Sequence, residues 1–149
     1  MRRMPAARHL LPCSAAVLAA SILGCSLGLD NNSGAHVGMN CVDDSKHCID
    51  ERTAALRSII NDKDRKWVKE PATPAAYASG VRLFAFKHHK RSLTCDELAL
   101  GRREADNANV ALRSPGSTEL TPAQVSRGVM LGAEVSRELT AEMQRRCKV

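Results

Sequence analysis

The sequence predicts an all-α protein, a small four-helix antiparallel bundle, and three observations lead to this fold class. After residue 48, apolar residues recur three, four or seven positions apart, which is the period of one helix face. Threonines followed by proline, or by Glu or Gln three positions later, mark helix starts at Thr73, Thr94 and Thr121. No run of alternating β-branched residues competes, and the expected connections are short, which favours antiparallel neighbours.

The first element of the chain has the parts of a secretory signal, expected over residues 1–24. Arg2, Arg3 and Arg8 give it a positive start, and residues 10–23 form an uncharged, mostly apolar stretch of 14 residues. A helix that crosses the bilayer core needs about 20 such residues. A cleaved signal is therefore favoured over a permanent transmembrane helix.

The signal ends at Ile22-Leu23-Gly24-Cys25, which resembles the lipobox of bacterial lipoproteins. The resemblance covers these four residues and their context, and no family is recognised in the rest of the chain. It implies that Cys25 becomes the N-terminus and carries a diacylglycerol, so that the protein is held in the cell envelope by a lipid anchor and faces the periplasm. By the same analogy, Ser26 favours the outer membrane over the inner one. The alternative is an ordinary signal cut near residues 19–21, giving a secreted soluble protein.

Beyond the signal we expect a flexible tether over residues 25–40 and one helical domain over residues 41–149. The tether is rich in Asn, Gly and Ser around residues 30–34. The 125 residues after the signal suffice for a single modest core. Loss of the three signal arginines lowers the formal net charge from +6 to +3. A nucleic-acid partner is therefore not expected.

The first predicted helix begins near Cys48 and runs to about Lys69, and Pro71 ends it. Its apolar face holds Ile49, Thr53, Leu56, Ile60 and Trp67. The second opens at Thr73-Pro74, a hydroxyl N-cap followed by proline at a position whose missing N–H costs nothing, and runs to about His89. Its core-facing residues are expected to be Tyr77, Val81 and Phe84.

The third predicted helix starts at a capping box formed by Thr94 and Glu97 and stops before residues 114–116. The fourth starts at Thr121-Pro122 with Gln124 at the third helical position, and continues to about Arg146. Glycines inside the helices predict close helix approach, with ordinary tolerance of glycine as the alternative. They are Gly80, Gly101, Gly128 and Gly132.

An up-down topology brings Cys48, Cys95 and Cys147 to one end of the bundle, with Cys41 close by. Four cysteines in an oxidising periplasm indicate two disulfides. We favour Cys95 with Cys147 and Cys41 with Cys48. The pairing of Cys41 with Cys147 and of Cys48 with Cys95 stays open.

A basic cluster is expected at the same end of the bundle. Such residues complement helix C-termini without any ligand, but they also suit contact with anionic lipid head groups or another acidic envelope component. The cluster comprises Lys87, His88, His89, Lys90, Arg91, Arg145, Arg146 and Lys148. His47, His88 and His89 form an alternative metal site there. Their spacing matches no recurrent metal motif, so no metal or other cofactor is expected.

No phosphate loop, nucleophile elbow or catalytic triad sequence occurs, and enzymatic activity is not expected. The leading interpretation is a lipid-anchored cell-envelope protein of unknown specific activity with a structural or partner-binding role. The alternative is a periplasmic protein that binds a small ligand or a metal. A filled core with both disulfides formed favours the first; a large apolar cavity inside the bundle, or convergent unpaired Cys and His, favours the second.

Overall fold

The computed structural model describes residues 38–148, which contain helices and no β-strand. The all-α fold class is thus confirmed for the described part of the chain. Its elements are α2 (Lys46–Asn61), the 3-10 helix η1 (Lys66–Lys69), α3 (Pro74–Ser79), α4 (Val81–His89), α5 (Cys95–Leu112), the 3-10 helix η2 (Pro115–Ser117) and α6 (Pro122–Arg146). The predicted signal, the lipidation site Cys25 and residues 25–37 of the predicted tether lie outside the described residues.

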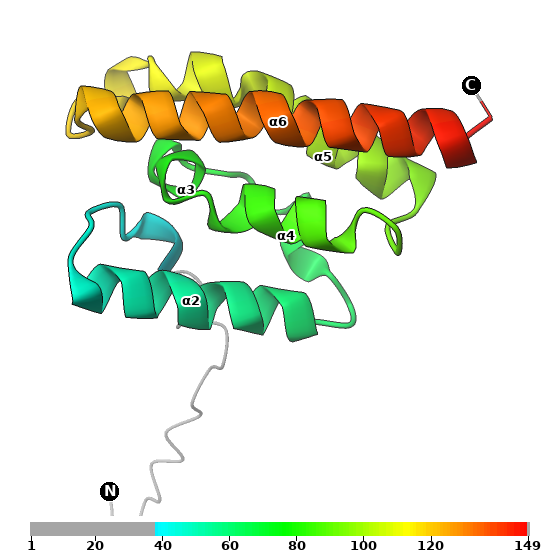
Figure 1. The fold of residues 1–149 in the computed structure, drawn as a ribbon, viewed down its shortest axis with the longest axis horizontal. Helices are drawn as coiled ribbons and strands as arrows, with labels where there is room; N and C mark the ends of the chain where they lie inside the picture. Colours follow the sequence, from blue (N-terminus) through cyan, green and yellow to red (C-terminus); the bar gives the residue numbers. More distant parts are fainter. Residues whose placement is uncertain (1–37, 149) are drawn as a thin grey trace, which may run out of the picture.

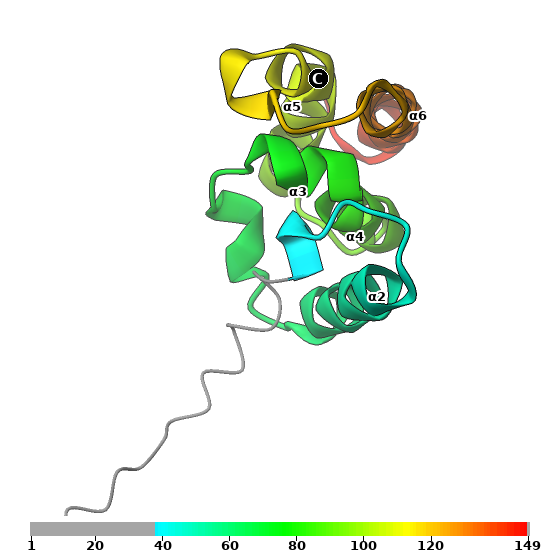
Figure 2. The same ribbon diagram turned by 90° about the vertical axis from the view of Figure 1, so that its left-hand side faces the viewer.

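The helices stack in three layers. α5 and α6 lie side by side and antiparallel, α3 and α4 form the middle layer, and α2 lies on the far side of α4 (Figures 1 and 2). Both α5 and α6 begin as predicted. In α5, the Thr94 hydroxyl accepts the Glu97 N–H at 3.2 Å, and the Glu97 carboxylate accepts the Thr94 N–H at 2.8 Å. Thr121 and Gln124 repeat this capping box at α6.

The first predicted helix is divided, because α2 ends at Asn61 instead of continuing to Lys69. The Asp62 carboxylate accepts the backbone N–H groups of Asp64 and Lys66, at 3.0 and 3.1 Å, and so offers the backbone an alternative to helical bonding. Arg65 then has a φ of 48°, in the left-handed region. The chain therefore turns after α2 and resumes helical structure only in η1.

The second predicted helix is divided at Gly80, whose φ of 76° places it in the left-handed region that favours glycine. α3 ends there and α4 leaves in a new direction. This break changes which residues of α4 face inward. Leu83 and Phe86 are buried, whereas 46% of Phe84 is exposed, so the prediction that Phe84 faces the core is wrong.

Between α2 and α3, residues 62–73 carry the chain back along the molecule, so α2, α4 and α6 run in the same direction (Figure 1). The start of α2 lies near the start of α6, where Arg127 pairs with Asp44 at 2.8 Å. At the C-terminal end of α4, Lys90 pairs with Glu138 of α6. The predicted antiparallel order of four helices therefore holds for α5 and α6 but not for α2, because a long connection, rather than a tight turn, follows it.

Both favoured disulfides are present, Cys41–Cys48 and Cys95–Cys147, and the rival pairing is not. They do not share one end of the molecule as predicted. The carbonyl of Val42, next to the first bridge, accepts a hydrogen bond from Gln124 at the start of α6. Cys147 follows the end of the same helix, whose 25 residues span about 37 Å. The two bridges therefore staple opposite ends, because α2 runs parallel to α6.

The folded part begins before Cys41, the predicted boundary of the tether. Residues 38–40 are helical, and Met39 is 6% exposed within the core. A Cβ atom at Gly38 would lie 2.3 Å from the carbonyl oxygen of Glu51, so this short segment packs directly against α2. The last three residues of the predicted tether thus belong to the domain.

Close helix approach at glycine is confirmed between α5 and α6. A Cβ at Gly132 would lie 2.8 Å from the Ala108 Cβ and 2.9 Å from the Ala105 carbonyl oxygen. Real Cβ atoms are almost never found so close to such atoms. The two longest helices can therefore pack backbone to backbone, with small side chains filling the contact.

Candidate binding groove

The basic residues of α4 are tied to acidic residues of α6. Lys87 binds Glu134 and also Glu138, the latter at 3.0 Å, and Lys90 binds Glu138. Hydrogen bonding to Glu134 raises the pKa of Lys87, and hydrogen bonding from Lys90 lowers the pKa of Glu138. These ion pairs join the middle layer of the molecule to α6.

Arg146 holds the end of α4 through backbone contacts. Its guanidinium donates to the carbonyls of Lys90, Arg91 and Leu93, at 3.2, 2.7 and 2.7 Å. Arg145 binds the buried carboxylate of Glu142. The structure thus brings both halves of the predicted basic cluster together, but several of its charges serve internal contacts. His88, Arg91 and Lys148 are exposed, and contact with anionic head groups stays a prediction.

The three histidines of the alternative metal site do not converge. His47 pairs with Glu51 at 3.2 Å at the start of α2, whereas His89 lies by Ile60 at its end. His47 and Ile60 are 13 positions apart on α2, which corresponds to about 20 Å of helix. The prediction of a metal site formed by His47, His88 and His89 is therefore wrong. Burial lowers the pKa of His89, and its Nε2 atom is buried without a hydrogen-bond partner.

Among residues 38–148, ligand atoms suited to a metal ion gather only at Cys41, Asp43 and Cys48. Both sulfur atoms of this group belong to one disulfide. Because thiolates, not disulfides, are the strong ligands for zinc and copper, the group offers a single carboxylate and no metal site.

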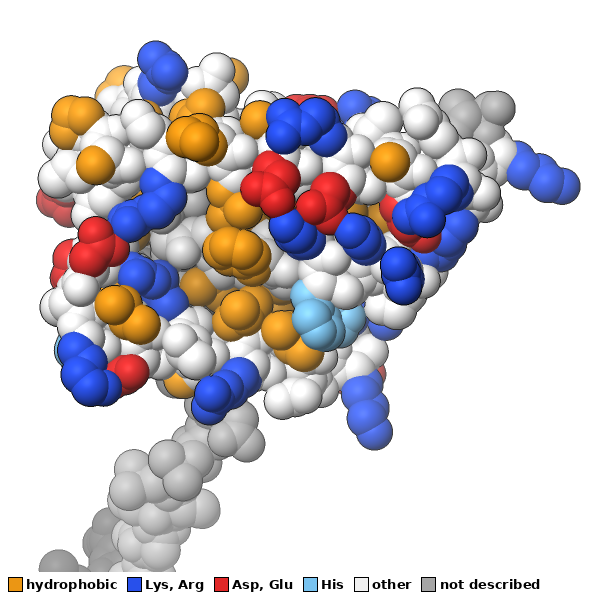
Figure 3. All heavy atoms as spheres, viewed as in Figure 1, with side chains coloured by type: hydrophobic (Ala, Val, Ile, Leu, Met, Phe, Trp, Pro, Cys, Tyr) orange, Lys and Arg blue, Asp and Glu red, His pale blue; other side chains and the backbone are white. Residues whose placement is uncertain are grey.

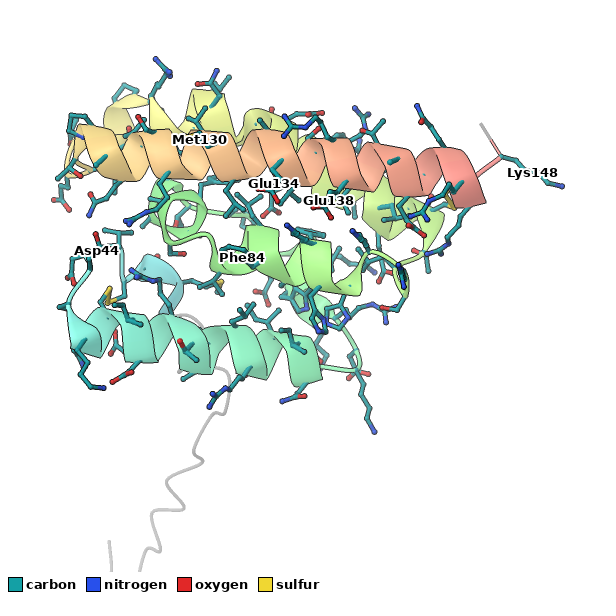
Figure 4. The ribbon with its side chains drawn as sticks, viewed as in Figure 1. Asp44, Phe84, Met130, Glu134, Glu138 and Lys148 are labelled. Atoms are coloured by element: carbon teal, nitrogen blue, oxygen red, sulfur yellow. A yellow bond between two sulfur atoms is a disulfide. The ribbon has the colours of Figure 1, made fainter. Side chains whose placement is uncertain are left out.

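A groove of about 610 Å³, which we call the α6 groove, lies on the surface formed by residues 38–148. One wall consists of residues 78–80 and Phe84, and the other is the face of α6 between Ala123 and Arg137. Figure 3 shows hydrophobic atoms gathered on this face, and Figure 4 shows Phe84 below Met130. Met130 is 73% exposed and Phe84 is half-buried, so two large apolar side chains are exposed at the groove.

α3 ends at Gly80, and α3 and α6 approach each other closely beside the groove. A Cβ at Gly80 would lie 2.8 Å from the Leu131 side chain, and a Cβ at Gly128 would lie 2.6 Å from that of Leu112. A second hollow, of about 160 Å³, lies on the other side of Phe84 and is lined by Ile49 and other residues of α2. Phe84 therefore stands between two apolar hollows.

Ion pairs flank the α6 groove, and one rim charge is free. Arg127 is used by Asp44 and by the Val42 carbonyl, while Glu134 is used by Lys87. Arg137 is exposed and lines the groove, and its side chain has no hydrogen bond or ion pair with any residue in the described range. The arrangement is thus an apolar floor with a single uncommitted guanidinium at its edge.

Sequence reasoning did not identify this groove. One signal was available: Met130 is a large apolar residue of α6 that lies outside the apolar stripe of this helix, which consists of Val125, Val129, Gly132, Val135, Leu139 and Met143. Within residues 38–148, no helix combines the length and apolarity needed to cross a bilayer.

Compared with models of known protein families, with curated proteins and with solved structures, the chain matches none of them.

Proposed function

We propose that this chain is a lipid-anchored cell-envelope protein that holds another envelope protein in its α6 groove. The observation that carries the proposal is the exposed pair of Phe84 and Met130 beside an apolar hollow of about 610 Å³. Exposed apolar side chains gathered beside a hollow are a feature that proteins commonly use to bind partners. Two disulfides suit an oxidising compartment, as the lipobox resemblance at Cys25 requires.

A protein partner is favoured over a small ligand by the shape of the site. Small-molecule sites bury most of the ligand surface, whereas here one wall is a helix face whose Met130 is 73% exposed. The core beneath is filled by side chains such as Leu83, Phe86 and Leu139, each fully buried. An open apolar surface over a filled, doubly stapled core is the arrangement of a docking module.

The anchor is tested by replacing Cys25 with serine. We expect the Cys25→Ser protein to lose incorporation of a radiolabelled or alkyne-bearing fatty acid, and to leave the membrane fraction, because two or three acyl chains supply the membrane affinity. Labelling and fractionation of whole cells measure both effects. A variant that still carries lipid and sediments with membranes would contradict the lipid anchor.

The groove is tested with a matched pair of exposed residues, Met130 and Val110, which are 73% and 71% exposed. Only Met130 lines the α6 groove. After chemical crosslinking in intact envelopes, we expect Met130→Glu to reduce the yield of the crosslinked complex about tenfold, because a carboxylate would be buried without a partner. Val110→Glu should leave the yield unchanged.

Both variants should unfold at the wild-type urea concentration, since exposed substitutions change stability by about 0.5 kcal/mol or less. The proposal fails if no complex forms, or if the two variants reduce it equally.

A further inference from the structure

We infer that the α6 groove receives an amphipathic helix of the partner, whose apolar face covers Phe84 and Met130 and whose carboxylate pairs with Arg137. The inference rests on the proposed function and specifies the chemistry of the partner. Three properties of the groove support it: the absence of a strand edge, its length, and the charge on its rim.

The walls of the groove offer side chains and no free backbone edge. α3, α4 and α6 use their backbone groups in helical hydrogen bonds, and residues 38–148 contain no strand. A partner in extended conformation gains affinity by adding a strand to a sheet edge, which this surface does not provide. A helix satisfies its own backbone and brings only side chains to the groove. Helix-in-groove recognition therefore fits this surface.

The length of the groove matches a helix of about four turns. Its α6 wall extends from Ala123 to Arg137, about 20 Å at the rise of an α-helix. The two flanking ion pairs involve Arg127 and Glu134, seven residues or about 10 Å apart. Apolar residues at positions i and i+7 of a docked helix have this same spacing, with i+3 and i+4 between them. Between Arg127 and Glu134 the α6 wall is lined by Gly128, Met130 and Leu131, an apolar stretch that suits such anchors.

The rim charge selects an acidic residue on the partner. Arg127 and Glu134 already have partners within the domain, whereas Arg137 has none among the described residues. A guanidinium at the edge of an apolar contact binds a carboxylate with two parallel hydrogen bonds. An Asp or Glu beside the last apolar anchor of the docked helix would meet this requirement.

The test uses the full chain in its native envelope, with the photoreactive residue p-benzoylphenylalanine in place of Met130. Mass spectrometry maps the crosslinked segment, and a synthetic peptide of that segment is then titrated against the purified protein. We expect apolar residues at helical spacing, an Asp or Glu on the flank, and a gain of helical circular dichroism on binding. Arg137→Glu should weaken peptide binding about tenfold.

Two controls separate the charge contact from general electrostatics. Arg57 is exposed on α2 and lines neither hollow, so Arg57→Glu should weaken binding less than threefold. Exchanging the peptide carboxylate for Arg should restore binding to the Arg137→Glu protein. A mapped segment that binds in extended form, a crosslink to a lipid acyl chain or to a second copy, or equal effects of the two Arg variants would overturn the helix inference. A complete lack of crosslinks at Met130 would instead overturn the proposed function.

Discussion

Replacing Arg82 by methionine is expected to lower the free energy of unfolding by about 3–5 kcal/mol, because it leaves the largely buried carboxylate of Glu104 without its partner. Arg82 is 2% exposed and binds both carboxylate oxygens of Glu104 on α5, at 2.8 and 2.6 Å. It also donates to the carbonyls of Trp67 and Glu70, at 2.7 and 2.9 Å. One guanidinium therefore ties α4 to α5 and to the connection that follows α2.

The measurement is urea unfolding of the purified protein followed by far-ultraviolet circular dichroism. A matched control is Arg102→Met on α5, whose ion pair with Asp106 at 3.1 Å is exposed to solvent. Exposed pairs contribute about 1 kcal/mol or less, so this variant should remain close to wild type. Equal losses in the two variants would contradict the role given to Arg82. If Arg82→Met does not fold at all, Glu104→Gln tests the same pair with a neutral acceptor and a smaller loss.

The second large effect is expected at the Cys95–Cys147 disulfide. Its removal by the double change Cys95→Ala and Cys147→Ala should cost about 4 kcal/mol, because a bridge with a sequence separation of 52 residues restricts the unfolded chain strongly. The bridge closes the α5–α6 pair at the end where Arg146 binds the Leu93 carbonyl. Urea unfolding without reductant gives the loss directly.

The Cys41–Cys48 bridge is the internal control. It spans only seven residues, and the same chain-entropy model assigns it about 2 kcal/mol. Cys48 is fully buried, so its truncation to alanine adds a packing loss. This loss narrows the expected difference in unfolding free energy between the two disulfide variants. A loss in the Cys41–Cys48 variant that equals or exceeds the loss in the other would contradict the loop-length argument.

The helices that could be predicted well are those whose signals lie within a few residues. α5 and α6 start at capping boxes in which the hydroxyl and the Glu or Gln are three positions apart, and α6 adds Pro122 at its first position. The favoured disulfide pairing was also correct, although the argument for it assumed one common end. It succeeded because α5 and α6 are antiparallel as assumed, and because Cys41 and Cys48 are close in sequence.

The α6 groove could not be predicted, because it joins segments that are distant in sequence and depends on a break. Apolar periodicity continues through Gly80, so it gave no sign that α3 ends there and that Phe84 turns outward. The basic run at residues 87–91 was visible as charge, but its ion pairs with Glu134 and Glu138 require α4 to lie along α6. Charge on a sequence shows which groups are present and not which are neutralised.

By itself, the sequence determined the all-α class and both ends of α5 and α6, and it favoured the correct disulfide pairs without excluding the rival pairing, because caps, prolines and apolar stripes act locally or between neighbouring helices. Only the tertiary structure decided the direction of α2. Residues 62–73 return along the molecule because Arg82 binds two of their carbonyls and Arg65 binds Glu97 at 3.1 Å, contacts between residues far apart in the chain. That reversal places the disulfides at opposite ends and separates His47 from His89, while the break at Gly80 leaves Phe84 and Met130 exposed beside the groove.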